Sequence, residues 1–502
     1  MDELLLSDAT DQLNALRDGR VGARELLMAA MARADRLDPS INAVVARDVE
    51  RALAAADAVD RARTGGQVLG PLAGLPMTVK DNFDIEGLPA SLGTKALLGR
   101  PAQDAEVVSR ARAAGAIVWG QTNVPAGSSD HQTYNTLYGV TRNPWDLART
   151  PGGSSGGSAA ALAAGFTALE IGADIAGSLR IPASFCGVAC HRPSWGLVSQ
   201  RGMPFPPGFL ADFDLVVVGP MARSVRDLQL LLGVLADVPT LPPPALSDIR
   251  IGLWLDEPTF PLDPAVRAAI ADFAGRLARE GVAVDPIASP LPAQAMLWTY
   301  MTLLAAILGA AQPAAALAVF ELFRGPAKIA KALGAGPLSW AHGVIGCTAR
   351  YHEWFAANEA RAQMKAQLAP VFDRCDVILA PVAGVTAFPH DHGPLQVMRR
   401  LTMSDGRRIG YLELVDWIAL ATLCDLPVTV IPIGRTPDGL PIGVQIIGRP
   451  GADAATLAVA GALEGVAGGF RAPPPLGAAA GQTSRRQKTP KRKAAETGAK
   501  VT

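Results

Sequence analysis

Short apolar segments alternate with helical segments through most of this chain, and this alternation limits the folds that the chain can adopt. From Gly70 onward the apolar segments are three to five residues long, bounded by Gly, Pro, Asn or Asp. They are Met77–Val79, Ile117–Gly120, Leu169–Gly172, Leu215–Val218, Ile249–Leu253, Val377–Leu379, Val428–Ile431 and Val444–Ile447. Such runs are typical of strands buried on both faces and covered by helices. The pattern predicts a single large α/β/α domain around a mixed, mostly buried β-sheet.

The N-terminal region has a helical pattern. In residues 7–63, Ser7 and Asp8 are candidate helix caps, and leucine and alanine recur at three- and four-residue spacing. No Ser/Gly/Pro-rich linker divides the chain before about residue 470. We therefore expect residues 1–69 to form a helical cover and residues 70–470 to form the main domain.

Charge is unevenly distributed along the 502 residues. After Ser484 there are seven Lys or Arg residues against Glu496, which gives this end a formal charge of +6. Because the whole chain is neutral, residues 1–484 carry −6. A mildly acidic body is poorly suited to binding nucleic acid. We expect residues 471–502 to form a disordered basic tail, with loose contact to nucleic acid or an anionic surface as the alternative.

The five cysteines are scattered, which is typical of a protein from the reducing cytoplasm. Cys186 and Cys190 lie four residues apart beside His191, but a second pair that would complete a zinc site is missing. We expect buried thiols, a core or surface histidine, no metal and no cofactor. Met1–Ser7 carries two acidic residues before three leucines, unlike the basic start of a secretory signal. A cytoplasmic location is predicted.

Residues 286–320 contain no charged side chain. Their best helical part, Ala295–Ala311, is 17 residues long and alanine-rich, and Pro313 follows it. This length is at the short limit for crossing a bilayer. A buried or pocket-lining helix is predicted, with contact to one membrane face or a membrane span as alternatives. We expect the substrate-contacting side chains in a variable apolar region at about residues 286–420.

Two glycine-rich loops that carry serine, Gly152–Ser158 and Gly172–Ser178, suggest one site. Small neighbours let backbone N–H groups approach a ligand, and good helix formers at 159–164 separate the loops. The first loop also matches the G-x-S-x-G elbow of α/β-hydrolases, but residues 146–151 before it do not resemble a strand. A P-loop needs lysine after the last glycine, where serine and alanine stand here.

A serine hydroxyl becomes a good nucleophile only when a neighbouring base accepts its proton. The six histidines form no recognisable pattern with Ser154, Ser155 or Ser178. Lys80, at the end of a short apolar strand, is the remaining candidate base. Taken alone, a lysine in this place is typical of a protein surface.

Several motifs that occur in a fixed order decide between these interpretations. They are G-L-P at 74–76 with V-K-D at 79–81, G-Q-T-N at 120–123, R-N-P-W-D at 142–146, the two serine loops, and G-L-P-I-G-V-Q-I-I-G at 439–448. Together they closely resemble the amidase signature family of hydrolases. The resemblance covers most of residues 10–460.

In that family a Ser-cisSer-Lys triad replaces the histidine triad. The resemblance implies that Ser178 is the nucleophile, Ser154 the bridging serine and Lys80 the base, and the interval of 24 positions from Ser154 to Ser178 fits the family spacing. A lysine base must be neutral, so burial must lower its pKa from about 10.4 toward roughly 7–8. The oxyanion donors implied by the resemblance are the backbone N–H groups of Ile175, Ala176, Gly177 and Ser178.

The sequence departs from the family pattern at two positions. Ala176 stands where a second glycine is usual, and alanine resists a positive φ, so it strains the loop only if the chain is left-handed there. Arg192 stands before a proline where lysine is usual, and we interpret this exchange as structural.

Four further residues are candidates for supporting roles. Asp174 and Arg180 are expected to shape the nucleophile loop, with substrate binding as the alternative. Ser155 is expected to supply a supporting hydrogen bond. Ser128, in a Gly-Ser-Ser-Asp loop, is a weaker candidate for lining the acyl pocket.

The resemblance implies an amidohydrolase that cleaves a small-molecule carboxylic amide to acid plus ammonia or amine, through an acyl-enzyme on Ser178. The apolar middle of the chain favours a substrate with a hydrophobic group, and family members often form homodimers. The main alternative is the glutaminase subunit of a glutamyl-tRNA(Gln) amidotransferase, although residues 411–417 do not resemble that subunit. Hydrolysis of a urea carboxylate or acylurea and a non-catalytic family member also stay open.

Overall fold

Each segment that the sequence predicts as a strand overlaps a strand of the structure, a computed structural model that describes residues 1–100, 102–203 and 210–476. The strands are β1 (Val44–Arg47), β2 (Pro76–Lys80), β3 (Ile117–Thr122), β4 (Tyr134–Asn135), β5 (Gly139–Val140), β6 (Leu169–Asp174), β7 (Ala189–Arg192), β8 (Val217–Ala222), β9 (Arg250–Leu253), β10 (Ala283–Pro286), β11 (Val377–Pro381), β12 (Arg400–Thr402), β13 (Arg408–Gly410), β14 (Val428–Arg435) and β15 (Pro441–Gly448).

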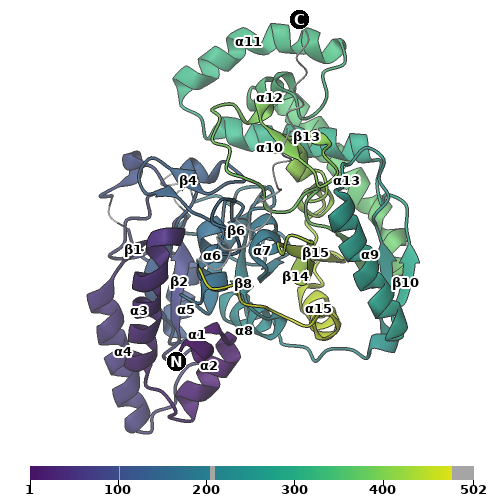
Figure 1. Ribbon diagram of the computed structural model, residues 1–502. Helices are drawn as coiled ribbons and strands as arrows, with labels where there is room; N and C mark the ends of the chain where they lie inside the picture. The colour runs from purple at the N-terminus through teal and green to yellow at the C-terminus, as the bar shows by residue number, and fades with distance from the viewer. Residues whose placement is uncertain (101, 204–209, 477–502) are drawn as a thin grey trace, which may run out of the picture.

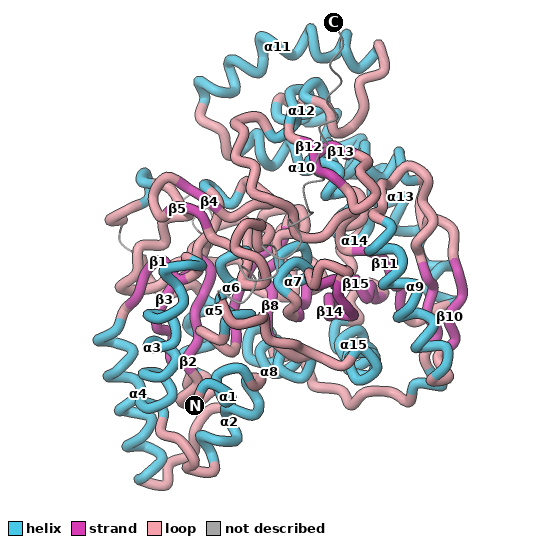
Figure 2. Tube along the Cα trace, in the orientation of Figure 1, coloured by secondary structure: helices cyan, strands magenta, loops and turns pink. Residues whose placement is uncertain are grey.

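The strands form one large mixed sheet and smaller ones. Eight strands pair in the order β10-β9-β11-β15-β14-β7-β8-β6, with β9 parallel to its two neighbours and the other pairs antiparallel. A second sheet has the order β1-β3-β2, and two further pairs are β4 with β5 and β12 with β13. Figure 2 shows the strands of the large sheet passing through the middle of the molecule, with helices around them.

Fifteen α-helices and five short 3-10 helices occur in the described residues. The α-helices are α1 (Asp2–Leu6), α2 (Ala9–Arg17), α3 (Ala23–Ile41), α4 (Val49–Thr64), α5 (Glu106–Ala113), α6 (Gly156–Ala164), α7 (Arg180–Cys186), α8 (Val225–Ala236), α9 (Pro264–Arg279), α10 (Ala293–Ala310), α11 (Ala314–Ala332), α12 (Trp340–Cys347), α13 (Tyr351–Arg374), α14 (Ala419–Leu423) and α15 (Asp453–Ala467). The 3-10 helices are η1 (Lys95–Leu97), η2 (Ala126–Ser128), η3 (Leu246–Asp248), η4 (Gln396–Met398) and η5 (Tyr411–Val415).

Helices cover both faces of the large sheet. On β15, Gly443 lies against Ser184 of α7, and Gly448 lies against Thr456 of α15. Residues five apart in a strand point to opposite faces. All eight residues of β15 are buried, as a strand between two helical layers requires. The predicted α/β/α architecture around a mixed, mostly buried sheet is therefore confirmed.

The N-terminal region is helical except at one place. Helices α1 to α4 lie together at the lower left of Figure 1, and Asp8 caps α2 by accepting a hydrogen bond from the N–H of Asp11. Between α3 and α4, however, residues Val44–Arg47 form β1, which pairs antiparallel with β3. Only Val44 of this strand is buried, and β1 lies at the edge of its sheet, so the helical pattern predicted for residues 7–63 is wrong at this place.

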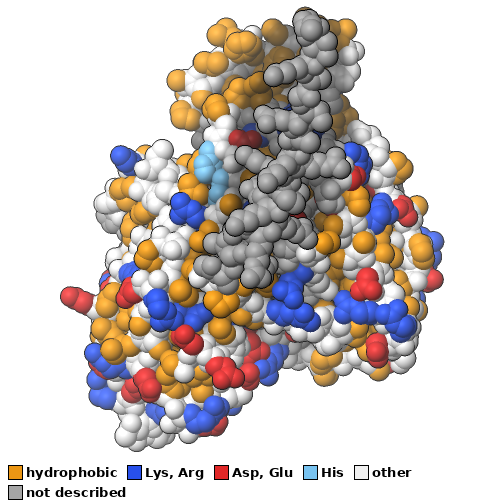
Figure 3. All heavy atoms as spheres, in the orientation of Figure 1, with side chains coloured by type: hydrophobic (Ala, Val, Ile, Leu, Met, Phe, Trp, Pro, Cys, Tyr) orange, Lys and Arg blue, Asp and Glu red, His pale blue; other side chains and the backbone are white. Residues whose placement is uncertain are grey.

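Helix α10 contains most of the apolar segment that the sequence singles out. Among the described residues, α10 is the one helix whose length and apolar composition would allow it to cross a membrane. However, 50% of this helix is buried inside the protein, as in the core helix of a soluble fold. Helices α11 and α12 project from the body at the top of Figure 1, where Figure 3 shows many apolar side chains on the surface. On α11 these include Leu322, Phe323 and Ile329.

The ends of two adjacent strands carry the predicted site residues. Strands β2 and β6 pack side by side, although they belong to different sheets. Lys80 ends β2 and Asp174 ends β6. Helix α6, whose nine residues are all buried, begins directly after the first serine loop. The fold thus brings both serine loops and the lysine to one place.

Candidate active site

The side chain of Lys80 reaches from the end of β2 into the protein interior and contacts Ser154. Its Nζ atom lies 2.7 Å from Ser154 Oγ and 3.5 Å from the carbonyl oxygen of Ala173. Lys80 and Ser154 are only 1% and 2% exposed, and the peptide bond between Gly153 and Ser154 is cis. The structure therefore joins the predicted base and the predicted bridging serine, which are 74 residues apart in sequence.

Burial changes the protonation of two groups beside this contact. It lowers the pKa of Lys80 to about 7, although the carboxyl groups of Asp174 and Glu170 act in the opposite direction. Burial also raises the pKa of Glu170 to about 8, although the hydrogen bond from Thr78 acts to lower it. A lysine with this pKa is partly neutral at pH 7, so it can accept a proton.

Ser178 lies on the second loop, directly beside the first. The N–H of Ser155 donates a hydrogen bond of 3.1 Å to the carbonyl oxygen of Ser178, which ties the two loops together. Ser178 is 6% exposed, and in the described part of the chain its hydroxyl forms no hydrogen bond. It makes no direct contact of this kind with the Ser154 hydroxyl. Its hydroxyl is thus free to meet a substrate.

Asp174 and Arg180 form a fully buried ion pair behind the second loop. The guanidinium of Arg180 donates to both carboxylate oxygens of Asp174, at 3.0 and 2.9 Å. Burial alone would raise the pKa of Asp174, but Arg180, Arg192 and the N–H of Gly177 outweigh it and hold this pKa well below its usual value. Arg180 also donates to Gln445 of β15, at 2.9 Å. The loop is therefore tied to the core of the large sheet.

The conformation of the second loop answers the question raised by Ala176. The residue with positive φ in this loop is Gly177, with φ of 89°, and Ala176 is not among the non-glycine residues with positive φ. A Cβ atom on Gly177 would lie 2.8 Å from Cδ1 of Ile181. Alanine at position 176 is therefore free of this strain, whereas glycine at position 177 is needed.

The backbone N–H groups of the loop differ in what they bind. That of Gly177 donates to Asp174 Oδ1 at 2.9 Å, so one of the four predicted oxyanion donors is already in use. The N–H groups of Ile175, Ala176 and Ser178 donate no hydrogen bond within the described residues. They are available to a negatively charged oxygen, and Ile175 and Ala176 are themselves partly exposed.

The remaining predicted residues have local contacts. The Ser155 hydroxyl is buried with no hydrogen-bond partner, so the backbone of Ser155 and not its side chain supports the loop. The Ser128 hydroxyl is likewise buried and unpaired, and no hydrogen bond joins Ser128 to Ser154 or Ser178 in the described residues. The geometry does not bring Ser128 into the lysine and serine cluster.

His191 and the neighbouring cysteines lie in the core. His191 contacts Thr429 at 3.0 Å and Asp453 at 3.1 Å through its two ring nitrogens, which confirms a core histidine with satisfied hydrogen bonds. Cys186 and Cys190 are free, buried thiols. Among residues 1–100, 102–203 and 210–476, no group of three His, Cys, Asp or Glu side chains could hold a metal ion.

Three side chains near the site were missed by sequence reasoning. Glu170 is fully buried on β6, and its Oε2 atom has no hydrogen-bond partner. His131 Nε2 lies 2.8 Å from the carbonyl oxygen of Ala176, and the hydroxyl of Tyr300 donates to the carbonyl oxygen of Ile175 at 3.0 Å. None of the three belongs to a motif with a fixed spacing, so only the fold reveals them.

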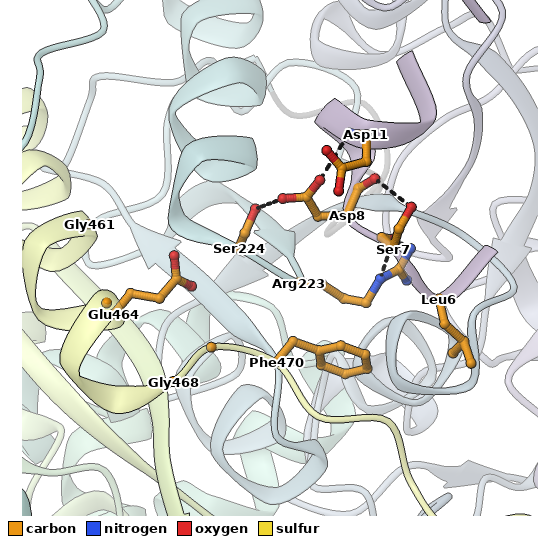
Figure 4. A pocket seen from close by; sticks show the side chains of 12 residues that line it. Leu6, Ser7, Asp8, Asp11, Arg223, Ser224, Gly461, Glu464, Gly468 and Phe470 are labelled. Carbon is orange, nitrogen blue, oxygen red and sulfur yellow. Dashed lines mark hydrogen bonds between the residues drawn. The ribbon is translucent and has the colours of Figure 1, made fainter. Parts of the chain in front are cut away.

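A separate cavity of about 510 Å³ lies beside the N-terminal helices (Figure 4). Its lining includes Asp8, Arg223, Glu464 and Phe470, and none of Lys80, Ser154 and Ser178. Arg223 donates its hydrogen bonds to backbone carbonyl groups of the protein. We therefore regard this cavity as a structural feature of the helical cover.

A buried lysine beside a serine hydroxyl, a second free serine and unpaired backbone N–H groups can together move a proton and hold a developing negative charge. With the fold, they define the chain as a hydrolytic enzyme. The family model described as Amidase matches residues 25–457. The chain therefore belongs to the Amidase family of amidase signature enzymes, and it is an amide hydrolase.

Known proteins of similar sequence and structure span nearly the whole chain. A glutamyl-tRNA(Gln) amidotransferase subunit from Chloroflexus aggregans is 32% identical over 484 residues, covering 90% of this chain and 94% of that protein. The structure of 6-aminohexanoate cyclic dimer hydrolase complexed with substrate matches with a TM-score of 0.74 and 29% identity, over 93% of this chain and 99% of that one.

A third similar protein comes from a structural study of the evolutionary origins of an s-triazine catabolic enzyme. It matches with a TM-score of 0.75 and 31% identity, over 93% of this chain and 99% of that chain. Similarity at this level to proteins with different names establishes the family and the fold.

Proposed function

We propose that this amidase hydrolyses a small-molecule carboxylic amide through an acyl-enzyme on Ser178, with Ser154 as the proton relay and Lys80 as the base. The observation that carries the proposal is the 2.7 Å contact between Lys80 Nζ and Ser154 Oγ in a fully buried site. The lowered pKa of Lys80, about 7, supports the role of a base at neutral pH.

In the first half of the reaction, Ser178 Oγ attacks the carbonyl carbon of the amide. Its proton passes to Ser154, whose own proton moves to the neutral amine of Lys80. The carbonyl oxygen becomes an oxyanion, and the N–H groups of Ala176 and Ser178 stabilise it, each such donor being worth about 3–4 kcal/mol. The C–N bond then breaks, and Lys80 returns the proton through Ser154 to the leaving nitrogen.

In the second half, water attacks the ester on Ser178. Its proton takes the same path to Lys80, and the new tetrahedral intermediate uses the same N–H donors. Collapse of this intermediate releases the carboxylic acid and returns the proton to Ser178. No histidine takes part in either half.

The apolar surface around the loop favours a substrate with a hydrophobic group. Ile175 and Ala176 are partly exposed, and α10 packs behind them through Tyr300. Asp174 and Arg180 are fully buried and paired with the protein, so we assign them to loop support and not to substrate binding.

The first test compares wild type with Ser178→Ala and Lys80→Ala on a panel of aliphatic, aromatic and amino-acid amides. We expect each substitution to lower kcat by a factor on the order of 10⁴, because the nucleophile or its base is removed. Ser155→Ala is the matched control, since its hydroxyl has no hydrogen-bond partner. Mass spectrometry of wild type during turnover should find the acyl group on Ser178, and undiminished turnover by both variants would reject the mechanism.

A second candidate function is the glutaminase subunit of a glutamyl-tRNA(Gln) amidotransferase. It is favoured by relatives named as subunits of that amidotransferase, such as the one from Cyanothece sp., which is 33% identical over 460 residues. Copurification with tRNA-binding partners and release of ammonia from glutamine would support it. An isolated chain that is fully active on hydrophobic amides and inactive on glutamine would exclude it.

We also propose a cytoplasmic location and a homodimer, with residues 70–470 as the catalytic domain and 1–69 as its helical cover. The five cysteines are free, and four of them are buried, which agrees with a reducing compartment. Cell fractionation and light scattering of the purified chain test the two statements separately. The predicted basic tail at 471–502 extends outside the described residues from position 477 onward.

A further inference from the structure

Three consecutive peptide groups of the nucleophile loop are held through their carbonyl oxygens. The first, between Ile175 and Ala176, accepts a hydrogen bond of 3.0 Å from the hydroxyl of Tyr300 on α10. Figure 1 shows α10 above the end of β6 and the start of α7, where this loop lies. Tyr300 is fully buried. In a trans peptide the N–H points away from the C=O, so the position of this carbonyl fixes the direction of the Ala176 N–H.

The second peptide group, between Ala176 and Gly177, is held at both ends. His131 Nε2 lies 2.8 Å from its carbonyl oxygen, and its N–H donates to Asp174 at 2.9 Å. A carbonyl oxygen can only accept, so Nε2 carries the hydrogen. The other ring nitrogen of His131 is buried and has no hydrogen-bond partner among the residues that the structure describes, which fits a neutral ring.

The third peptide group, between Gly177 and Ser178, is held by the first turn of α7. Its carbonyl oxygen accepts a hydrogen bond of 2.8 Å from the N–H of Ile181. The Ser178 N–H then points the other way and has no partner in the described residues. Of these three peptide groups, the first and the third therefore present unpaired N–H groups, those of Ala176 and Ser178.

We propose that Tyr300 and His131 are positioning residues that hold the loop carbonyl groups away from the substrate and so aim the N–H groups of Ala176 and Ser178 at the oxyanion. This inference rests on the proposed function. Preorganised donors stabilise an oxyanion because they need no rearrangement during the reaction. Neither side chain touches the reacting atoms in this role. Both act through the backbone of the loop.

The test uses a fluorophosphonate probe, which reacts with an activated serine and releases fluoride, without requiring knowledge of the substrate. Its phosphoryl oxygen gains negative charge in the transition state of this reaction and should then lie in the oxyanion site. Tyr300→Phe removes only the hydroxyl, and we expect roughly 10-fold slower labelling of Ser178, with kcat on the best amide reduced by a similar factor and KM within about twofold. The matched control is Thr299→Val on the same helix, because the Thr299 hydroxyl bonds only Ala295 of α10. It should label at the wild-type rate.

His131 provides an independent arm with a conservative rescue. Gln places an amide N–H near the position of Nε2, so His131→Gln should label within about threefold of wild type, whereas His131→Leu should be at least 10-fold slower. If His131→Leu does not fold, equal labelling of His131→Gln and wild type still supports the hydrogen bond, and labelling of His131→Gln that is 10-fold slower overturns it for this residue.

The outcomes separate this inference from the function on which it rests. A wild-type chain that the probe does not label, or labels at a residue other than Ser178, rejects the proposed function and this inference together. If wild type is labelled at Ser178 and Tyr300→Phe is labelled equally fast, the inference about Tyr300 fails and the proposed function stands. If Thr299→Val slows labelling as much as Tyr300→Phe does, the effect belongs to a disturbance of the helix, and the inference about Tyr300 is rejected.

Discussion

In the proposed mechanism a single buried amine, that of Lys80, sets the pH range in which the site can work. The pKa of Lys80 lies at about 7 because burial disfavours its charged form. Below this pH the amine is protonated and cannot accept a proton from Ser154. Above it, the neutral form dominates.

We therefore predict that kcat/KM rises with pH through about 7 and reaches a plateau above it. A profile of kcat/KM against pH with the best amide substrate checks this prediction. The measurement is restricted to pH values at which the enzyme is stable. A profile that is flat between pH 6 and 8 would contradict a base of this pKa.

The buried carboxyl group of Glu170 makes the stability of the folded protein depend on pH. Burial raises its pKa to about 8 in the folded chain, against an ordinary value of 4.5. A raised folded-state pKa means that its stabilising contribution is complete below pH 4.5 and is lost as the pH rises through 8. We predict that the melting temperature of wild type falls relative to that of Glu170→Gln between pH 5 and 8. Parallel curves for the two proteins would reject this linkage.

Two neighbouring positions of the nucleophile loop should differ in how well they tolerate substitution. Ala176→Gly should keep activity within about threefold, because φ at this position is not positive. Gly177→Ala places a Cβ atom 2.8 Å from Ile181 at φ of 89°, and we predict a loss of more than 10-fold in kcat with lower thermal stability. Assay and thermal unfolding of both variants test the pair, and the reverse order of effects would refute the loop conformation.

At the scale of elements, Arg223 attaches the N-terminal helices to the body. Directly after β8, it donates to the carbonyl groups of Leu5 and Ser7 on one side and to those of Leu162 and Thr167 on the other. It is 1% exposed. The side chain thus joins the end of α1 to α6 and to the segment that follows α6.

We predict that Arg223→Met lowers the free energy of unfolding by about 3 kcal/mol, because it leaves buried carbonyl groups unpaired. Arg226→Met is the control. Arg226 pairs with Asp8 and Asp11 at the surface, where such a pair is worth about 0–1 kcal/mol. Chemical denaturation measures both, and equal losses would contradict the structural role of Arg223.

The eight apolar segments of the sequence each predicted a strand, and the other strands were missed. Strand β7 contains His191 and Arg192, whose polar atoms find partners more than 200 residues away, such as Thr429 and the carbonyl oxygen of Leu426. Strand β10 is a largely exposed edge, so its residues did not need to be apolar. Neither the distant partners nor the place at an edge can be derived from local periodicity.

The candidate site divides in the same way. Lys80, Ser154 and Ser178 could be proposed as site residues because the motifs that contain them resemble, in order, those of the amidase signature family. Tyr300 could not, since it lies 125 residues from the carbonyl group that it binds, on a helix whose composition indicates only burial. The protonation of Lys80 and Glu170 also required the structure, because burial determines it.

At the scale of the whole molecule, one hydrophobic core extends from Leu5 to Leu463, so most of the chain should unfold together. Helix α11 is different, because Arg324 and Ala327 are its only buried residues and Leu322 is 78% exposed. We predict that hydrogen exchange is fastest in α11 and slowest in β15, whose residues are all buried. Exchange measured by mass spectrometry checks this, and strong protection of α11 in a monomer would contradict it.

The hydrogen bond from Tyr300 to Ile175 has a consequence for protein engineering. Helix α10 belongs to the apolar part of the chain in which we expect the substrate contacts, so it is a natural segment to exchange between relatives. Because the same helix also binds the loop that carries Ser178, we expect such a graft to change the reaction rate together with the specificity. On the proposed role of Tyr300, a chimera should retain a hydroxyl at this position, and recombination libraries should exchange α10 and the loop together.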